Sequence, residues 1–164
     1  MRTAICPGSF DPVTFGHLDI INRSRKVFDK TIVAVLVNPE KHTLFTVDER
    51  IGLLKRCTSG MDDVEVVGFE GLLAEYARER GVTAIVKGLR ALSDFEYEFQ
   101  QALTNKVLNP NLETMFLTTN ADNMFLSSSI VKQIAGFGGD ISNFVPECIL
   151  DDIMKRICTG GKMQ

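Results

Sequence analysis

Residues 6–19 read CPGSFDPVTFGHLD, and this stretch follows a short apolar run and leads into apolar side chains at helical spacing. The pattern predicts a buried strand, a loop and an amphipathic helix. Gly8 and Gly16 allow the backbone to approach a bound group, and a helix that begins near Gly16 directs its unpaired N–H groups toward the loop. Such a junction attracts phosphate. We expect His17, at the mouth of this helix, to donate a hydrogen bond to an anionic oxygen.

Apolar strand patterns alternate with helical patterns along the rest of the chain. After the first strand at residues 3–6, strands are predicted at 31–37, 64–67, 83–86 and 113–117, and further helices at 46–59, 72–80, 94–109, from 127–129 onward, and at 146–159. This order predicts right-handed βαβ crossovers. We therefore expect an α/β fold, a Rossmann-like, doubly wound, parallel five-stranded sheet, in a single domain over residues 1–164, with a frayed tail from about 160.

Polar segments follow four of the predicted strands. They occupy residues 7–17, 38–42, 87–90 and 123–129. In an open parallel sheet, ligands bind beyond the carboxyl ends of the strands. We therefore expect these four segments to line one site.

Composition limits the classes of partner. The formal net charge is −3, without a long block of like charge, so we expect no nucleic-acid partner. The four cysteines are widely spaced and form no zinc pattern, which is typical of small apolar residues in a reducing compartment. No apolar run approaches the length of a membrane span, so we expect a soluble, cytoplasmic protein with no membrane partner.

The sequence motifs also have structural explanations. Glycines and prolines punctuate most turns, and a histidine near a helix start is often a cap. The serines at 127–129 could cap a helix, with at least one expected to do so. Lys132 is expected to be solvated, Glu98 could lie on a helix surface, Leu73 could be core, and the phenylalanines of the fourth predicted helix are expected to pack.

A family resemblance favours the functional interpretation. GSFDPVTFGH at residues 8–17 resembles the signature of the nucleotidylyltransferases. TFGH at 14–17 begins with threonine, as in the phosphopantetheine adenylyltransferase branch, where most of the superfamily has histidine. KGLR at 87–90, DFEYE at 94–98 and SSSIVK at 127–132 are similar to that branch's other motifs, in the same order. The resemblance covers nearly the whole chain.

The resemblance implies roles for particular residues. His17 and Lys41 would be catalytic, with His17 stabilising the transition state. Acceptor contacts would come from Ser9, Phe10, Lys41, Leu73 and Lys87, and ATP contacts from Ser9, Phe10, His17, Gly88, Leu89, Arg90, Glu98, Asn123, Met124, Phe125, Leu126, Ser127, Ser128 and Ser129. Two positions depart from the branch: Ser9 stands where threonine is frequent, and Lys87, where arginine is usual, presents a point charge in place of a bidentate fork.

The implied reaction transfers the adenylyl group of ATP to 4′-phosphopantetheine, giving dephospho-coenzyme A and pyrophosphate. The acceptor phosphate is already an anionic nucleophile, so the protein must align two polyanions at the α-phosphorus and stabilise the developing charge. Mg²⁺ would bridge the triphosphate. The resemblance also implies a homohexamer and feedback binding of coenzyme A.

Two other functions remain open from the sequence. One is a nucleotidylyltransferase that acts on nicotinate mononucleotide or a polyol phosphate, against which Thr14 argues. The other is a non-catalytic nucleotide-sensing module.

Overall fold

A computed structural model describes residues 1–37, 42–90 and 92–159, and it has the predicted parallel sheet. The strands are β1 (Thr3–Gly8), β2 (Lys30–Leu36), β3 (Val64–Phe69), β4 (Ala84–Leu89) and β5 (Glu113–Thr118). All neighbours pair in parallel, in the order β3-β2-β1-β4-β5. The fold class predicted from the sequence is confirmed.

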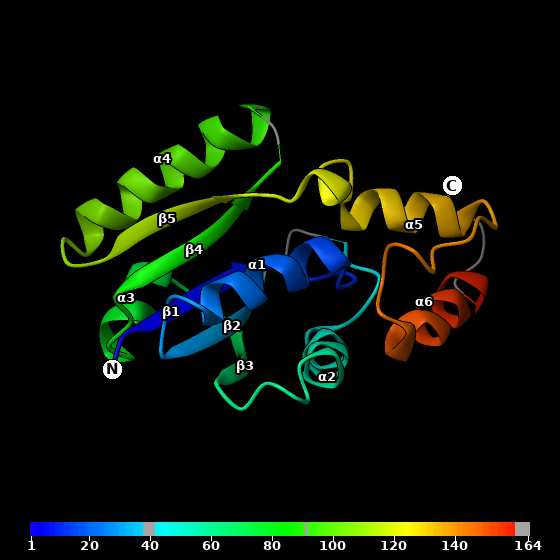
Figure 1. Ribbon diagram of the computed structural model, residues 1–164, viewed down its shortest axis with the longest axis horizontal. Coiled ribbons are helices and arrows are strands. Elements are labelled where there is room, and N and C mark those ends of the chain that lie inside the picture. Colours follow the sequence, from blue (N-terminus) through cyan, green and yellow to red (C-terminus); the bar gives the residue numbers. More distant parts are fainter. Residues whose placement is uncertain (38–41, 91, 160–164) are drawn as a thin grey trace.

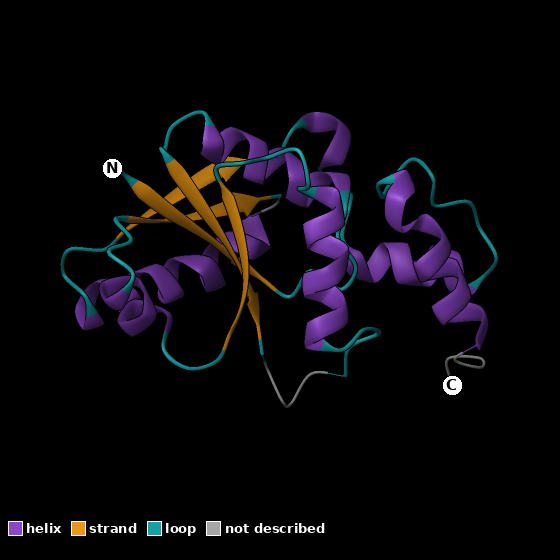
Figure 2. Ribbon diagram, turned by 90° about the horizontal axis from the view of Figure 1, so that it is seen from below, coloured by secondary structure: helices purple, strands orange, loops and turns teal. Residues whose placement is uncertain are grey.

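Helices cover both faces of this sheet (Figure 2). They are α1 (Phe15–Arg25), α2 (Val47–Cys57), α3 (Leu73–Glu79), α4 (Leu92–Leu108), α5 (Ser128–Gly136) and α6 (Glu147–Thr159), with a short 3-10 turn, η1 (Ala121–Asn123), before α5. In Figure 1, α5 and α6 lie beyond the end of the sheet toward which β1 points. Within the described residues, no helix is long and apolar enough to cross a membrane.

Alternate residues of the central strands belong to two separate cores. On β2, Val33 and Val35 join the cluster that includes side chains of α1, α2, α5 and α6, whereas Ile32 and Ala34 join the cluster beneath α3. Successive side chains of a strand point to opposite faces. The continuous apolar runs of the sequence therefore reflect burial on both faces of the sheet.

The strand register places the carboxyl ends at one edge. Gly8 at the end of β1 pairs with Val35, and Leu36 at the end of β2 pairs with Phe69. Leu89 of β4 pairs with Thr118 of β5. The segments that follow these strands therefore leave the sheet at a common rim, as the sequence predicted.

Two boundaries differ from the sequence prediction in ways that affect the site. β4 continues to Leu89, so residues 87–89 lie in the strand and only Arg90 follows it. The prediction of a polar loop over residues 87–90 is wrong, because the pairing with β5 extends through these positions. The predicted loop at 38–42, apart from His42, and the predicted tail at 160–164 lie outside the described residues.

Helix α4 also differs from expectation. Phe99 is 45% exposed, Leu103 53% and Val107 81%, so the predicted packing of this apolar side occurs only in part within the chain. Phe99 stacks on Phe95, with ring centroids 5.4 Å apart. Phe95 does contact Phe116 of β5, with ring centroids 5.8 Å apart. The rest of this apolar face is left on the surface.

Candidate active site

His17 is built into the N-terminal cap of α1. Thr14 is the cap residue, and its side chain accepts a hydrogen bond from the His17 backbone N–H, at 3.4 Å. In return, the Thr14 backbone N–H donates to His17 Nδ1 at 3.0 Å. This is a capping box in which histidine takes the place usually held by glutamate or glutamine. Because Nδ1 accepts this hydrogen bond, the ring proton of neutral His17 is on Nε2.

His17 is also electrostatically biased toward the neutral form. Burial and, to a smaller extent, the positive charge of Arg90 together lower the pKa of its imidazole to about 4. The Phe10 ring lies edge-on to the imidazole, with centroids 5.0 Å apart. At neutral pH His17 is therefore an uncharged donor in a fixed orientation.

The bend between β1 and α1 depends on Gly8 and Phe10. Phe10 is buried and has a positive φ of 49°, so the chain turns sharply there. A Cβ at Gly8 would lie 3.0 Å from two carbons of the Phe10 ring. Glycine at position 8 therefore lets the ring fold back against the strand end.

Asp11 connects this loop to two other segments. Its Oδ2 accepts a hydrogen bond from the Leu44 N–H at 2.8 Å, and its Oδ1 accepts one from the Phe45 N–H at 2.9 Å. Lys132 Nζ of α5 lies 3.0 Å from Oδ2. The expectation of a solvated Lys132 is wrong, because its ammonium group pairs with a buried carboxylate. Sequence reasoning did not assign this role to Asp11.

Arg50 is a second buried connection that sequence reasoning missed. Its Nη1 donates to the Ser9 carbonyl oxygen at 2.8 Å and to the Leu36 carbonyl oxygen at 3.3 Å, joining the loop after β1 to the end of β2. The signal was present, since Arg50 falls three residues after Val47 and four before Leu54, on the apolar stripe of α2. A charged residue at such a position needs internal partners.

The start of α5 packs against the same loop. Ser127 is the N-cap of α5, and its Oγ accepts a hydrogen bond from the Ile130 N–H at 3.1 Å, which confirms that at least one of these serines is a cap. Ser128 Oγ donates to the Pro12 carbonyl oxygen at 2.7 Å. Ser129 is exposed. The serine segment is therefore held beside the loop that carries His17.

Arg90 and the segment before α5 complete this rim. Arg90 Nη1 donates to the Leu126 carbonyl oxygen at 3.1 Å. Leu126 is buried, whereas Met124 and Phe125 are more than half exposed. Asn123 lies close to Gly16, since a Cβ built there would be 3.8 Å from the Asn123 Cβ. The structure thus gathers the first loop, Arg90 and residues 123–128.

Lys87 and Glu98 form a pair between β4 and α4. Lys87 Nζ lies 3.0 Å from Glu98 Oε2 and donates a hydrogen bond to Oε1 at 3.3 Å. Their side chains are 21% and 22% exposed. Glu98 Oε2 is buried and, among the described residues, accepts no hydrogen bond, so its contact with Lys87 is an ion pair.

The remaining predicted residues are placed as follows. Gly88 packs on α1, where a Cβ would lie 2.7 Å from Ile20 Cγ1, so its small size has a packing reason. Leu89 ends β4. Leu73 begins α3 after the end of β3 and is partly buried against the second core. Lys41 lies outside the described residues.

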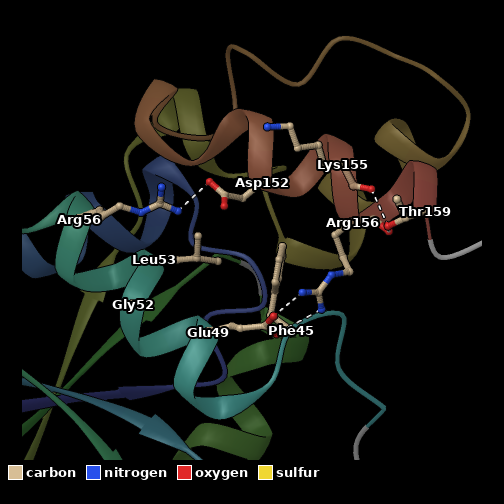
Figure 3. A pocket seen from close by; sticks show the side chains of 9 residues that line it. All are labelled: Phe45, Glu49, Gly52, Leu53, Arg56, Asp152, Lys155, Arg156 and Thr159. Atoms are coloured by element: carbon tan, nitrogen blue, oxygen red, sulfur yellow. Dashed lines mark hydrogen bonds and ion pairs between the residues drawn. The ribbon is translucent and has the colours of Figure 1, made fainter.

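A cavity of about 540 Å³ lies elsewhere, between α2 and α6 (Figure 3). Its lining includes Phe45, Arg56 and Asp152, and none of the residues predicted to bind ATP or the acceptor. Among the described residues, no group of three or more His, Cys, Asp or Glu side chains could hold a metal ion.

Comparisons with known proteins show the family of the chain. The cytidylyltransferase-like family model matches residues 5–134. The phosphopantetheine adenylyltransferase of Caldanaerobacter subterraneus subsp. tengcongensis is 58% identical over 95% of this chain and 98% of that protein. The one of Clostridium botulinum (strain 657) is 57% identical over 96% of each chain.

A solved structure shows the same fold at low identity. The nicotinic acid mononucleotide adenylyltransferase of Plasmodium falciparum, complexed with NaAD, superposes with a TM-score of 0.69 at 14% identity, over 94% of this chain and 95% of that one. The chain thus belongs to the cytidylyltransferase-like family and, within it, to the phosphopantetheine adenylyltransferases.

Proposed function

We propose that this chain transfers the adenylyl group of ATP to 4′-phosphopantetheine, forming dephospho-coenzyme A and pyrophosphate. The names and high identity of the relatives support this substrate pair. The structural observation that carries the proposal is the fixed, neutral His17 imidazole at the N-terminus of α1, with Arg90 close enough to lower its pKa.

In the proposed reaction, a phosphate oxygen of 4′-phosphopantetheine attacks the α-phosphorus of ATP. A new P–O bond forms as the bond between the α-phosphorus and the bridging oxygen breaks, and pyrophosphate leaves with that electron pair. No proton has to be removed from the nucleophile, since the attacking phosphate is an anion at neutral pH. The protein therefore acts by alignment and charge stabilisation.

His17 is proposed to stabilise charge on the α-phosphate. Its Nδ1 is occupied by the Thr14 N–H, so Nε2–H is the donor available to a phosphate oxygen. A neutral donor that is already oriented requires little reorganisation as negative charge develops. The α1 N-terminus adds further N–H groups and a positive dipole end at the same place.

The other proposed contacts follow the rim. ATP would meet Ser9, Phe10, residues 88–90, Glu98 and residues 123–129, while the acceptor would meet Ser9, Lys41, Leu73 and Lys87. Lys41 would be the second catalytic residue, and it would supply a positive charge. The gathering of Arg90 and the Ser127–Ser128 segment beside the first loop supports the ATP set.

Mg²⁺ is the proposed cofactor, bound through the triphosphate oxygens. When bound it would neutralise part of the charge on the triphosphate and the departing pyrophosphate. The side chains of Arg90 and Ser129 are proposed to contact the charged phosphates at this rim.

We also propose a cytoplasmic homohexamer that binds no nucleic acid or membrane and takes coenzyme A as a feedback ligand. The exposed apolar face of α4, with Phe99, Leu103 and Val107, supports burial against further copies of the chain. Light scattering tests the assembly. A Val107→Asp variant should dissociate it if α4 forms an interface, and Lys55→Asp on the outer side of α2 is the control.

The reverse reaction tests the proposed activity most directly. Dephospho-coenzyme A and pyrophosphate supplied with Mg²⁺ should yield ATP. His17→Ala should lower turnover by roughly 10² or more, because one oriented donor to the transition state is lost. Asn22→Ala, on the exposed face of the same helix, is the matched control. Absence of ATP with the wild-type chain, or full turnover by His17→Ala, would contradict the proposal.

A further inference from the structure

Two cysteines that are distant in the sequence face each other at the junction of α2 and α6. Cys57 is the last residue of α2, and Cys148 lies in the first turn of α6. Their sulfur atoms are 3.8 Å apart across 91 residues of sequence. An S–S bond is about 2.05 Å long, so the two sulfur atoms need to approach by about 1.8 Å. Rotation of the two side chains, together with a small shift of one helix, can bring the sulfur atoms closer by this distance.

The two helices are held in register beside these thiols. Arg56, which precedes Cys57, pairs with Asp152 at 2.7 Å, and Asp152 lies one turn after Cys148 on the same side of α6. Farther along, Arg156 of α6 donates to Glu49 of α2 at 3.2 Å. Figure 3 shows both ion pairs bridging the two helices. The thiols are therefore kept opposite each other by contacts that do not involve sulfur.

The two thiols differ in their access to solvent. Cys148 is exposed, whereas Cys57 is partly buried. Burial, followed by the neighbouring Cys148, raises the pKa of the Cys57 thiol to about 12. A small reagent therefore reaches Cys148 first, while Cys57 is protected from direct attack.

We propose that Cys57 and Cys148 form a thiol–disulfide site that low-molecular-weight disulfides oxidise reversibly. The Cys148 thiolate attacks one sulfur of the small disulfide, forming a mixed disulfide and releasing one small thiol. Cys57, as its thiolate, then attacks Cys148 Sγ, and the second small thiol leaves. The two protein thiols lose two electrons and two protons, and the small disulfide gains both.

The product would tie the C-terminal end of α2 to the N-terminal end of α6. Such a link constrains the unfolded chain over a long loop, so it stabilises the folded state. The proposal is independent of the transferase activity, because neither cysteine is among the proposed substrate contacts.

The test uses the full-length chain and glutathione disulfide as the probe. Peptide mapping without reduction should find Cys57 joined to Cys148. The midpoint of thermal unfolding should rise by roughly 5 to 15 °C and return after dithiothreitol treatment. Cys57→Ser should instead accumulate glutathione on Cys148. Cys148→Ser should show neither the disulfide nor the increase in the midpoint of thermal unfolding.

Cys158→Ser is the matched control, since Cys158 is an exposed cysteine of the same helix. It should form the link to the same extent as the wild type. A stable mixed disulfide on Cys148 of the wild type, with Cys57 still free, would overturn the proposal. So would a disulfide formed between two chains, or an unchanged mass. If Cys57→Ser does not fold, the wild-type map and Cys148→Ser still decide.

Discussion

The loop after β1 and the end of β4 reach the same edge of the sheet, but their polar groups are held differently. At the first loop, Asp11 of the loop and Arg50 of α2 are buried, and both bind backbone atoms of other segments. At the end of β4, Lys87 and Glu98 bind each other while each remains about one fifth exposed. The first loop is fixed by the fold, whereas the Lys87–Glu98 pair can separate when a ligand binds.

This difference suits two different tasks. Donors that develop strong contacts only in the transition state work best when they are already oriented, and the Thr14–His17 capping box provides this. A partly exposed ion pair contributes little to stability, so an anionic ligand can attract Lys87 away from Glu98 at a small cost. The predictions below test whether the first loop is rigid and the β4 pair adaptable.

Asp11→Ala should have the largest effect. It removes the acceptor of two backbone N–H groups and leaves Lys132 without its carboxylate partner. Breaking such a buried pair should lower the free energy of unfolding by about 3 to 5 kcal/mol. Urea unfolding measures this. Asp62→Ala, at an exposed position, should change it by less than about 0.5 kcal/mol. Equal effects of the two substitutions would mean that the first loop is not held by Asp11.

The next largest expected effect is a loss of stability at low pH, caused by protonation of His17. Its pKa in the folded state is about 4, below its usual value of 6.5, so between these values the unfolded state binds the extra proton and the folded state does not. The contribution of neutral His17 to the free energy of unfolding is therefore fully present above pH 6.5 and is lost as the pH falls toward 4. The loss should reach roughly 3 kcal/mol near pH 4.

NMR titration of the His17 ring and urea unfolding from pH 7 to 4 measure this effect. His17→Gln should show a smaller loss of stability over the same range, because glutamine does not titrate. A ring midpoint near 6.5 would place His17 in a solvent-like environment and remove the distinction between the two regions.

Most of the fold could be predicted because the sequence carries local signals for it. Thr46 and Glu49 have the spacing of a capping box in the sequence, and this box is present at the start of α2. Glycine is favoured in the left-handed conformation that follows many helices, and Gly81, just after the predicted helix at 72–80, has a φ of 62°. The end of β4 was missed because Lys87 and Gly88 resemble loop residues, whereas their pairing with β5 is a long-range contact.

The site was predicted less completely, because several of its contacts join segments far apart in sequence. His17 could be found from its position at a helix mouth. Asp11 could not be recognised as a connection, since its partners are the backbone N–H groups of Leu44 and Phe45 and the ammonium group of Lys132, all far away in the sequence. The fourth helix shows a related limit, since an apolar stripe does not reveal whether its partner belongs to the same chain.

Ser128→Ala should have a moderate effect. It removes the hydrogen bond of 2.7 Å to the Pro12 carbonyl oxygen, which connects α5 to the first loop. The expected loss of stability is about 1 kcal/mol. Ser129→Ala, at an exposed neighbouring position, should alter stability by less than about 0.5 kcal/mol. Chemical denaturation compares the two. If Ser128→Ala is as stable as Ser129→Ala, α5 is not held by this contact.

The Lys87–Glu98 pair should give the smallest change in stability. Glu98→Gln keeps the size and an acceptor oxygen but removes the negative charge, and the free energy of unfolding should fall by less than about 1 kcal/mol. Lys87→Met should be similarly mild. Their effects on ligand binding should differ in direction, because an unpaired Lys87 attracts an anion more strongly and a missing Lys87 does not attract it at all.

Calorimetric titration with 4′-phosphopantetheine distinguishes these effects. Lys87→Met should weaken binding by about tenfold, which corresponds to the loss of one charged hydrogen bond of about 1.4 kcal/mol, whereas Glu98→Gln should bind at least as tightly as the wild type. A large loss of stability in both variants, with unchanged binding, would assign the pair to the fold. The end of β4 would then be as fixed as the first loop, and Lys87 would not be available to a substrate phosphate.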